Sequence, residues 1–251
     1  MPATVITASG SGSPDGAQER HDLPEQHRQV GRGRFVPALA TVREVAIEHT
    51  PPNTIFYDQS GRGGVDCDVL VEGADAKGRG IVAVIETKFV EPDFSTYGFR
   101  RSRRADEGRV TCPDDVALGG DYARCLYTSR KRYRYWAETV ARGTLNLGAL
   151  PAAGCPFAGP GWQLWVNHTL AHAEAAGRGA ARAVYAVCAP AANDALLRGG
   201  TVLGSFAALV TDPATVVLMP LDEVIGAIAE TGGGAWHGAW CEGLRARYAG
   251  I

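Results

Sequence analysis

Apolar and polar residues alternate in the stretch 65–72, interrupted only by Leu70, which predicts a β-strand with two unlike faces. The next apolar stretch, 81–90 (IVAVIETKFV), is almost wholly hydrophobic until its end, as expected for a strand at the centre of a sheet. The turn-like sequence GADAKGRG separates the two stretches. We therefore expect a β-hairpin, in which one face of the first strand carries Asp66, Asp68, Leu70 and Glu72.

The remaining pattern predicts helices that alternate with strands. Apolar residues at helical spacing favour an amphipathic helix over 35–49. Further helices are expected at 127–141, 162–179, 193–210 and 221–231, with strands at 181–190 and 214–220 and a last helix near the C-terminus. This alternation predicts an α/β fold, in which helices flank a mixed β-sheet.

Composition places these elements in one domain. The chain has 251 residues, of which 45% are hydrophobic, so residues 32–251 suffice for a single core. Residues 1–31 are rich in small and polar residues and predict a disordered tail. No stretch approaches the roughly 20 apolar residues that cross a bilayer, so no membrane partner is expected. The N-terminus lacks the pattern of a secretory signal, which predicts a cytoplasmic protein with reduced cysteines.

Candidate chemistry lies at the end of the apolar strand, where Glu86 and Lys88 share one face. Burying two charges is costly unless they are paired or hold a metal. Asp68 lies eighteen residues before Glu86, with the turn midway, so the hairpin brings the three side chains together. Two carboxylates and the carbonyl of Thr87 would suit Mg²⁺ or Mn²⁺. A lysine beside them can orient a metal-bound water and stabilise charge on a phosphate oxygen.

Two simpler interpretations remain open. Glu86 and Lys88 can form an ordinary salt bridge at a strand end, with Asp68 in a neighbouring turn. Asp66 competes with Asp68 because both point the same way, although the apolar run that follows Asp68 favours it as the residue at the strand entrance. Glu91 is either a supporting hydrogen-bonding group, an extra metal ligand or a solvated loop acid.

The motifs DVLV, VAVIETKF and WQLWVNHTLA, in this order, resemble the D…E-x-K core of the PD-(D/E)XK nuclease superfamily. They are similar in particular to its restriction-endonuclease branch, in which an E-(V/T)-K-(Y/F)-x-E segment precedes a cysteine-containing region and a Q-L-x-x-N helix. The resemblance covers about residues 35–230. It implies a restriction-endonuclease-like core and a metal-dependent nuclease.

The resemblance also implies roles for single residues. Asp68 and Glu86 would bind the metal, and Lys88 would be the catalytic lysine. Gln163 matches the glutamine that some branches place on the following helix, with Asn167 one turn later on the same face. Either Glu44 or Glu48 would be the upstream helix glutamate, with a slight preference for Glu44. Cys67 stands where the family often has proline, and the visible Pro92–Asp93 follows the E-x-K and cannot supply its acid.

Two basic blocks, residues 99–109 and 129–136, provide what a DNA-binding surface needs, although the chain carries a net charge of −2. Both blocks follow the candidate strand, and the second interleaves its cations with aromatic rings suited to stacking. The alternative is that both are ordinary solvated surfaces. The candidate phosphate contacts are Arg100, Arg101, Arg103, Arg104, Arg130, Lys131, Arg132 and Arg134.

Cys112, Cys125 and Cys155 could hold a structural Zn²⁺ or an iron–sulfur cluster, with His168 or another cysteine as the fourth ligand. Their spacings of 13 and 30 residues are not diagnostic, and free thiols are the alternative. His168 and His172 lack the glutamate of a zinc protease between them, and there is no G-x-S-x-G elbow. No phosphate-loop motif occurs either, so no nucleotide triphosphate is expected.

These observations predict a Mg²⁺-dependent DNA endonuclease concerned with restriction, defence or repair. A double-strand cutter would need two active sites and hence a homodimer. The alternative hypothesis is a nuclease-derived module that binds DNA or a protein without cutting.

Overall fold

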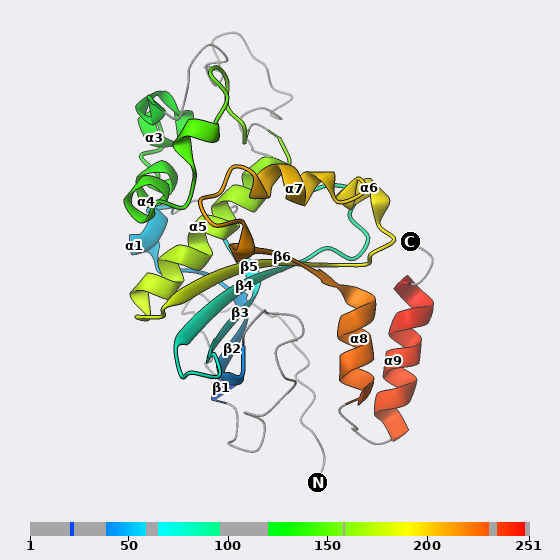
Figure 1. Ribbon diagram of the computed structural model, residues 1–251. Coiled ribbons are helices and arrows are strands. Elements are labelled where there is room, and N and C mark those ends of the chain that lie inside the picture. The colour runs from blue at the N-terminus through cyan, green and yellow to red at the C-terminus, as the bar shows by residue number, and fades with distance from the viewer. Residues whose placement is uncertain are drawn as a thin grey trace.

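The computed structural model describes residues 21–22, 39–58, 65–95, 120–157, 159–230 and 235–248. Its centre is a mixed six-stranded sheet in the order β1-β2-β3-β4-β5-β6, in which β1 to β4 are antiparallel and β4, β5 and β6 are parallel (Figure 1). The strands are β1 (His21–Asp22), β2 (Thr41–His49), β3 (Cys67–Ala74), β4 (Gly80–Thr87), β5 (Arg182–Ala189) and β6 (Val216–Pro220). The α/β prediction with a mixed sheet is confirmed.

Helices cover both faces of this sheet (Figure 1). One face packs mainly against α5, and residues of α8 and α9 join the core on the other. The described helices and 3₁₀ turns are α1 (Asn53–Phe56), η2 (Tyr122–Arg124), α3 (Leu126–Ser129), α4 (Tyr135–Arg142), η3 (Leu147–Ala149), α5 (Gly161–Gly177), α6 (Asp194–Leu197), α7 (Thr201–Ala207), η4 (Pro213–Thr215), α8 (Leu221–Glu230) and α9 (Ala235–Tyr248).

The hairpin of β3 and β4 has the predicted arrangement. Leu70 pairs with Val84, and both side chains enter the core beneath α5. Alternate residues of β4, such as Ile81 and Ile85, pack on the side of α8 and α9. Because β4 is buried on both faces, it is apolar from Ile81 to Ile85, and polar residues follow only at its last two positions.

The helix predicted at 35–49 is wrong, because the described part of that stretch contains the strand β2. The spacing of Val42, Val45 and Ala46 fits a helix, but β-branched residues favour a strand when a partner is available. β3 supplies that partner, and a register irregularity between Val42 and Glu44 disturbs the alternation that would have revealed a strand. Tertiary pairing therefore outweighs the local pattern.

Two other predicted helices are each divided. The helix expected at 127–141 is broken between α3 and α4, where Arg132 has a φ of 61°. The helix expected at 193–210 is broken between α6 and α7, because Arg198, Gly199 and Gly200 all have positive φ. The other predicted strands and helices are confirmed, including the helix near the C-terminus.

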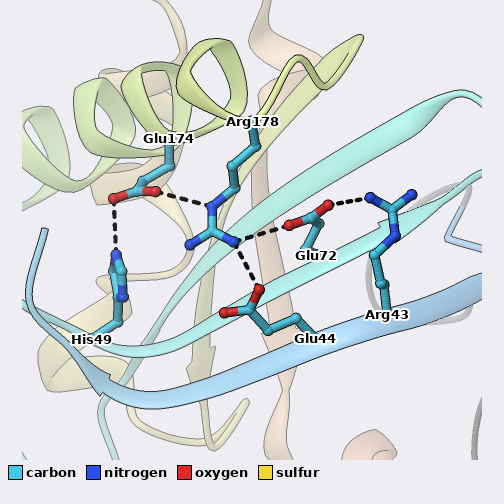
Figure 2. A network of polar contacts seen from close by, with 6 residues as sticks. All are labelled: Arg43, Glu44, His49, Glu72, Glu174 and Arg178. Carbon is cyan, nitrogen blue, oxygen red and sulfur yellow. Dashed lines mark hydrogen bonds and ion pairs between the residues drawn. The ribbon is translucent and has the colours of Figure 1, made fainter. Parts of the chain in front are cut away.

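A buried polar network fixes the end of α5 to β2 and β3 (Figure 2). The Nη1 atom of Arg178 lies 3.0 Å from Glu44 Oε2 and 2.9 Å from Glu72 Oε2, and its Nε lies 3.1 Å from Glu174 Oε2. Glu174 also contacts His49, with 2.8 Å between Oε1 and Nε2. One guanidinium thus bridges carboxylates from three elements.

Two further predictions concern the N-terminal tail and membrane-spanning segments. Of the tail predicted at 1–31, only residues 21–22 are described, and they form β1 beside β2. Within the part of the chain that the structure describes, no helix combines the length and apolar character that crossing a membrane requires.

Candidate active site

The two predicted metal-binding carboxylates lie opposite each other at one edge of the sheet. The β3–β4 ladder ends at the pair Val69 and Ile85, and one further step places Asp68 opposite Glu86. Asp68 Oδ2 accepts hydrogen bonds from the backbone nitrogen of Thr87 at 2.6 Å and from its hydroxyl at 2.5 Å. Both acids follow the side-chain alternation that faces α5.

Glu86 is the centre of this cluster. Its Oε1 atom lies 2.8 Å from Lys88 Nζ and accepts a hydrogen bond from Gln163 Nε2 at 2.6 Å. Its Oε2 atom accepts from Asn167 Nδ2 at 2.9 Å. Glu86 is only 4% exposed and Lys88 only 7%. The structure therefore brings together Asp68, Glu86, Lys88 and Gln163, as the sequence predicts, with Asn167 on the same face of the helix as Gln163.

Negative charge exceeds positive charge at this site. Burial raises the pKa of Glu86; Lys88 opposes this effect, and the nearby Asp68 adds to it. Burial, followed by the charges of Glu86, Glu174 and Asp68, raises the pKa of the Cys67 thiol far above its usual range. Cys67 therefore remains a neutral thiol. The single charge of Lys88 is accompanied by the buried carboxylate of Glu86 and the half-buried carboxylate of Asp68, and this excess of negative charge favours binding of a further cation.

The donor set fits a magnesium-class ion. Among the described residues, no three His, Cys, Asp or Glu side chains come together in a way that could hold a metal. Mg²⁺ does not need such a set, because it keeps several waters and is often bound through one or two carboxylates and a substrate phosphate. Asp68 and Glu86 would supply the carboxylates. The Thr87 carbonyl stays the predicted third donor, whereas its amide and hydroxyl hold Asp68 in place.

The segment that follows Lys88 is fastened at several points. Lys88 N donates to the carbonyl of Cys188 at 2.8 Å, and Ser95 N donates to Gln163 Oε1 at 2.8 Å. Asn193 Nδ2 donates to the carbonyl of Glu91 at 3.1 Å. Gln163 thus contacts both Glu86 and the segment that leads toward the first basic block.

Neither acid of this segment has a described hydrogen bond or ion pair to the cluster of Glu86, although the charge of Lys88 acts on Glu91. Glu91 Oε2 accepts from the Val90 amide, and Asp93 contacts Arg198 at 3.4 Å. Burial would raise the pKa of Glu91, but backbone hydrogen bonds and Lys88 lower it overall. Pro92 and Asp93 therefore belong to the loop after Lys88 and not to the candidate site, in agreement with the interpretation from sequence.

Glu44 is not on a helix and does not join this site. It lies on β2 opposite Glu72, where both contact Arg178. Glu72 is four residues from Asp68 on β3, which corresponds to roughly 13 Å along the strand. Glu48, the alternative, also lies on β2, with a φ of 52°. The prediction of a glutamate on an upstream helix is thus wrong, because Glu44 and Glu48 lie on the strand β2. Glu44 belongs to the Arg178 network.

The structure describes the candidate phosphate contacts of only one of the two basic blocks. Arg100, Arg101, Arg103 and Arg104 lie outside the described residues, so their role stays a prediction. Arg130, Lys131, Arg132 and Arg134 are exposed.

Two of the three aromatic residues of the second block are buried and cannot stack on bases, whereas Tyr133 is half-buried and stacks on Tyr127. Arg134 contacts Glu138 at 2.8 Å and lies 5.3 Å above the ring of Tyr57. Tyr135 and Trp136 are buried in the core, and Tyr135 donates to Asp58. The second block thus offers a cationic surface over a packed aromatic core.

The predicted cysteine site gains no support from the described residues. Cys125 is buried and Cys155 half-buried, whereas Cys112 lies outside the described residues. His168 Nε2 is 2.9 Å from the Thr215 hydroxyl, which itself donates to the carbonyl of Asp212. Nε2 of His168 must therefore carry the proton in that contact. His168 is a core histidine in this structure.

Burial of His168 predicts a loss of stability in acid. Burial and the neighbouring His172 lower the pKa of His168 to about 3 from its ordinary 6.5. Between these values only the unfolded chain takes up the proton, so the free energy of unfolding should fall by about 1.4 kcal/mol per pH unit as pH drops below 6.5. Urea unfolding from pH 7 to 4 should show this slope, which His168→Leu should reduce and the half-buried control His237→Leu should not. An unchanged slope in His168→Leu would contradict the assignment.

Sequence reasoning missed two contributors. It considered only the carbonyl of Thr87, although the threonine between Glu86 and Lys88 was visible and its hydroxyl binds Asp68. It also missed Tyr185, whose pKa is affected by the charge of Glu86. Tyr185 lies in the middle of the apolar strand β5, and nothing in the sequence distinguishes it from its neighbours.

Comparison with known proteins leaves the geometry as the basis for assigning a function. No protein-family model matches the chain, and neither a curated protein nor a solved structure shows significant similarity to it.

Proposed function

We propose that this protein is a Mg²⁺-dependent DNA endonuclease with a restriction-endonuclease-like core. The observation that carries this proposal is the cluster of Asp68, Glu86 and Lys88 at the edge of the sheet, with Gln163 bonded to Glu86. An acid-bearing antiparallel hairpin, followed through α5 by a parallel strand, supports the same family resemblance.

Each residue of the cluster has a chemical role that follows from its position. Asp68 and Glu86 would hold the metal, which supplies Lewis-acid activation of water and of a phosphate oxygen. Lys88, buried beside Glu86, would orient the attacking water and stabilise charge that develops on the phosphate. Gln163 and Asn167 fix the Glu86 carboxylate, and Thr87 fixes Asp68. Such preorganised groups need little rearrangement during the reaction.

A specific observation supports one other function. Glu86 already receives contacts from Lys88, Gln163 and Asn167, so the hydrogen-bonding capacity of its carboxylate is met without a metal. A protein that uses the same fold only to bind DNA would retain DNA in EDTA, with strong salt dependence and no turnover.

Incubation of the protein with four substrates tests the proposal: supercoiled plasmid, linear duplex, single-stranded DNA and RNA, each with Mg²⁺, Mn²⁺ or EDTA. We expect metal-dependent cleavage of DNA and its loss in Asp68→Asn, a nearly isosteric change that removes one charge. Direct linearisation of plasmid would indicate paired active sites in a homodimer, whereas nicking would indicate one. DNA retention without cleavage in any metal would favour the binding module.

A further inference from the structure

Tyr57 is an exposed aromatic residue that the proposed chemistry does not use. It directly follows the short helix α1 and is 49% exposed. Its φ of 54° is uncommon for a residue other than glycine, and its amide donates to the carbonyl of Asn53 at 2.9 Å. An unfavourable backbone conformation persists only where the surrounding contacts enforce it, and such residues are often found at binding sites.

The residues on either side of Tyr57 are fixed to the start of α4. The buried Phe56 has its ring centre 5.0 Å from that of Tyr135, and its carbonyl accepts a hydrogen bond from the amide of Arg134 at 2.8 Å. The hydroxyl of Tyr135 donates to the carboxylate of Asp58. These contacts hold α1 beside α4 (Figure 1). The exposed ring of Tyr57 is therefore held in place before any ligand arrives, which reduces the entropic cost of binding.

The exposed cations of the second basic block lie next to this ring. The guanidinium carbon of Arg134 lies 5.3 Å from the centre of the Tyr57 ring, over one face. Arg130, Lys131 and Arg132 are exposed on the segment just before Arg134. Proteins that bind single-stranded nucleic acids combine such cations, which contact phosphates, with aromatic rings that stack on bases. Tyr57 thus supplies the exposed ring that the buried aromatic residues of the block do not.

An open pocket connects the segment around Tyr57 with the chain that enters β3. Its lining includes Phe56 and Asp58 from that segment and Asp66 from just before β3. Asp66 precedes Asp68 by two residues, which is at most about 7 Å along the chain. A strand of DNA that is bound at Tyr57 can therefore continue to a phosphate at Asp68.

We propose that Tyr57 stacks on an unpaired base of the DNA substrate, while the cations of the second basic block contact the adjoining phosphates. Bases inside a duplex are already stacked on their neighbours, so Tyr57 acts only on a single-stranded part of the substrate. The substrate class is thus DNA with a single-stranded section, such as an overhang or a flap. The inference rests on the proposed function for the identity of the ligand as DNA, and it adds the form of DNA that is bound.

Binding in EDTA tests this inference, because the proposed cleavage needs a metal and the DNA stays intact. Fluorescence anisotropy measures the affinity of wild type, Tyr57→Leu and Tyr57→Phe for a labelled oligothymidylate and for a blunt duplex. We expect Tyr57→Leu to weaken binding of the single strand by about 5- to 150-fold, the range for loss of one stacked base, and Tyr57→Phe to bind as wild type does. The duplex affinity of Tyr57→Leu and its salt dependence on the single strand should stay unchanged, because stacking releases no counterions.

Trp240→Leu is the matched control, because Trp240 is 46% exposed on α9, which lies far from α4 (Figure 1). It should bind both DNAs as the wild type does, and circular dichroism shows whether each variant is folded. Failure of the wild type to bind the single strand, or wild-type affinity in Tyr57→Leu, would overturn the inference. Equal weakening for single strand and duplex would overturn it too, since that result indicates a purely electrostatic surface.

The outcome for the proposed function is separate. Binding that depends on Tyr57, without cleavage in Mg²⁺ or Mn²⁺, would retain the stacking site and reject the proposed catalysis. Metal-dependent cleavage by a protein whose affinity for the single strand does not depend on Tyr57 would do the reverse.

Discussion

Replacement of Lys88 by methionine should lower the DNA cleavage rate by about 10²- to 10⁴-fold, the range found when one positioned proton-transfer or charge-stabilising group is removed. Lys88 lies 2.8 Å from Glu86 and is buried, so its charge is held at one position within the cluster. Methionine preserves most of the buried aliphatic chain and removes the charge. Single-turnover cleavage of plasmid DNA at saturating Mg²⁺ measures the effect.

Lys77→Met is the control, because Lys77 is exposed in the turn between β3 and β4, at the opposite end of the hairpin. It should cleave as the wild type does. Circular dichroism and urea unfolding would show whether Lys88→Met is folded, since Gln163 and Asn167 still contact Glu86. A folded Lys88→Met protein that retains more than about a tenth of the activity contradicts the role of Lys88.

Replacement of Arg178 by alanine should have the largest effect on stability, a loss of about 3–5 kcal/mol in the free energy of unfolding. Three carboxylates, those of Glu44, Glu72 and Glu174, would be left close together without their shared counter-charge (Figure 2). Arg43→Ala is the matched control. Its side chain is 64% exposed and contacts the same Glu72, so its loss should cost less than about 1 kcal/mol.

The effect of Arg178→Ala should depend on pH. Burial would raise the pKa of Glu174, but contacts with His49 and Arg178 lower it overall. A lowered folded-state pKa contributes stability above the ordinary pKa, and this contribution disappears as pH falls through the folded value. The difference between wild type and Arg178→Ala in urea unfolding should therefore shrink as pH falls below 4.5, the ordinary pKa of this carboxyl. Equal destabilisation by Arg43→Ala and Arg178→Ala would show that the network is not the cause.

The candidate site could be predicted because it depends on local rules. Alternation along one hairpin and a helix that places Gln163 and Asn167 one turn apart suffice to converge on Glu86. The Arg178 network has no such rule, since Arg178 is 134 residues from Glu44 and 106 from Glu72. Contacts of that range depend on how α5 crosses the sheet.

The prediction of secondary structure failed where local preference and tertiary context differ. β2 has an apolar spacing that also fits a helix, and only its pairing with β3 decides between them. The break after α6 had a visible signal in Gly199 and Gly200, which allow the positive φ that ends a helix. The break before α4 had no visible signal in the sequence, because Arg132 adopts a positive φ although it is not a glycine.

The most direct test of the account is the conversion of supercoiled plasmid to nicked or linear DNA by one wild-type preparation, first in EDTA and then after excess Mg²⁺ is restored. The account predicts no conversion in EDTA, full recovery with Mg²⁺, and no recovery for folded Asp68→Asn. Cleavage that persists in EDTA, or that is equal in wild type and Asp68→Asn, would contradict it.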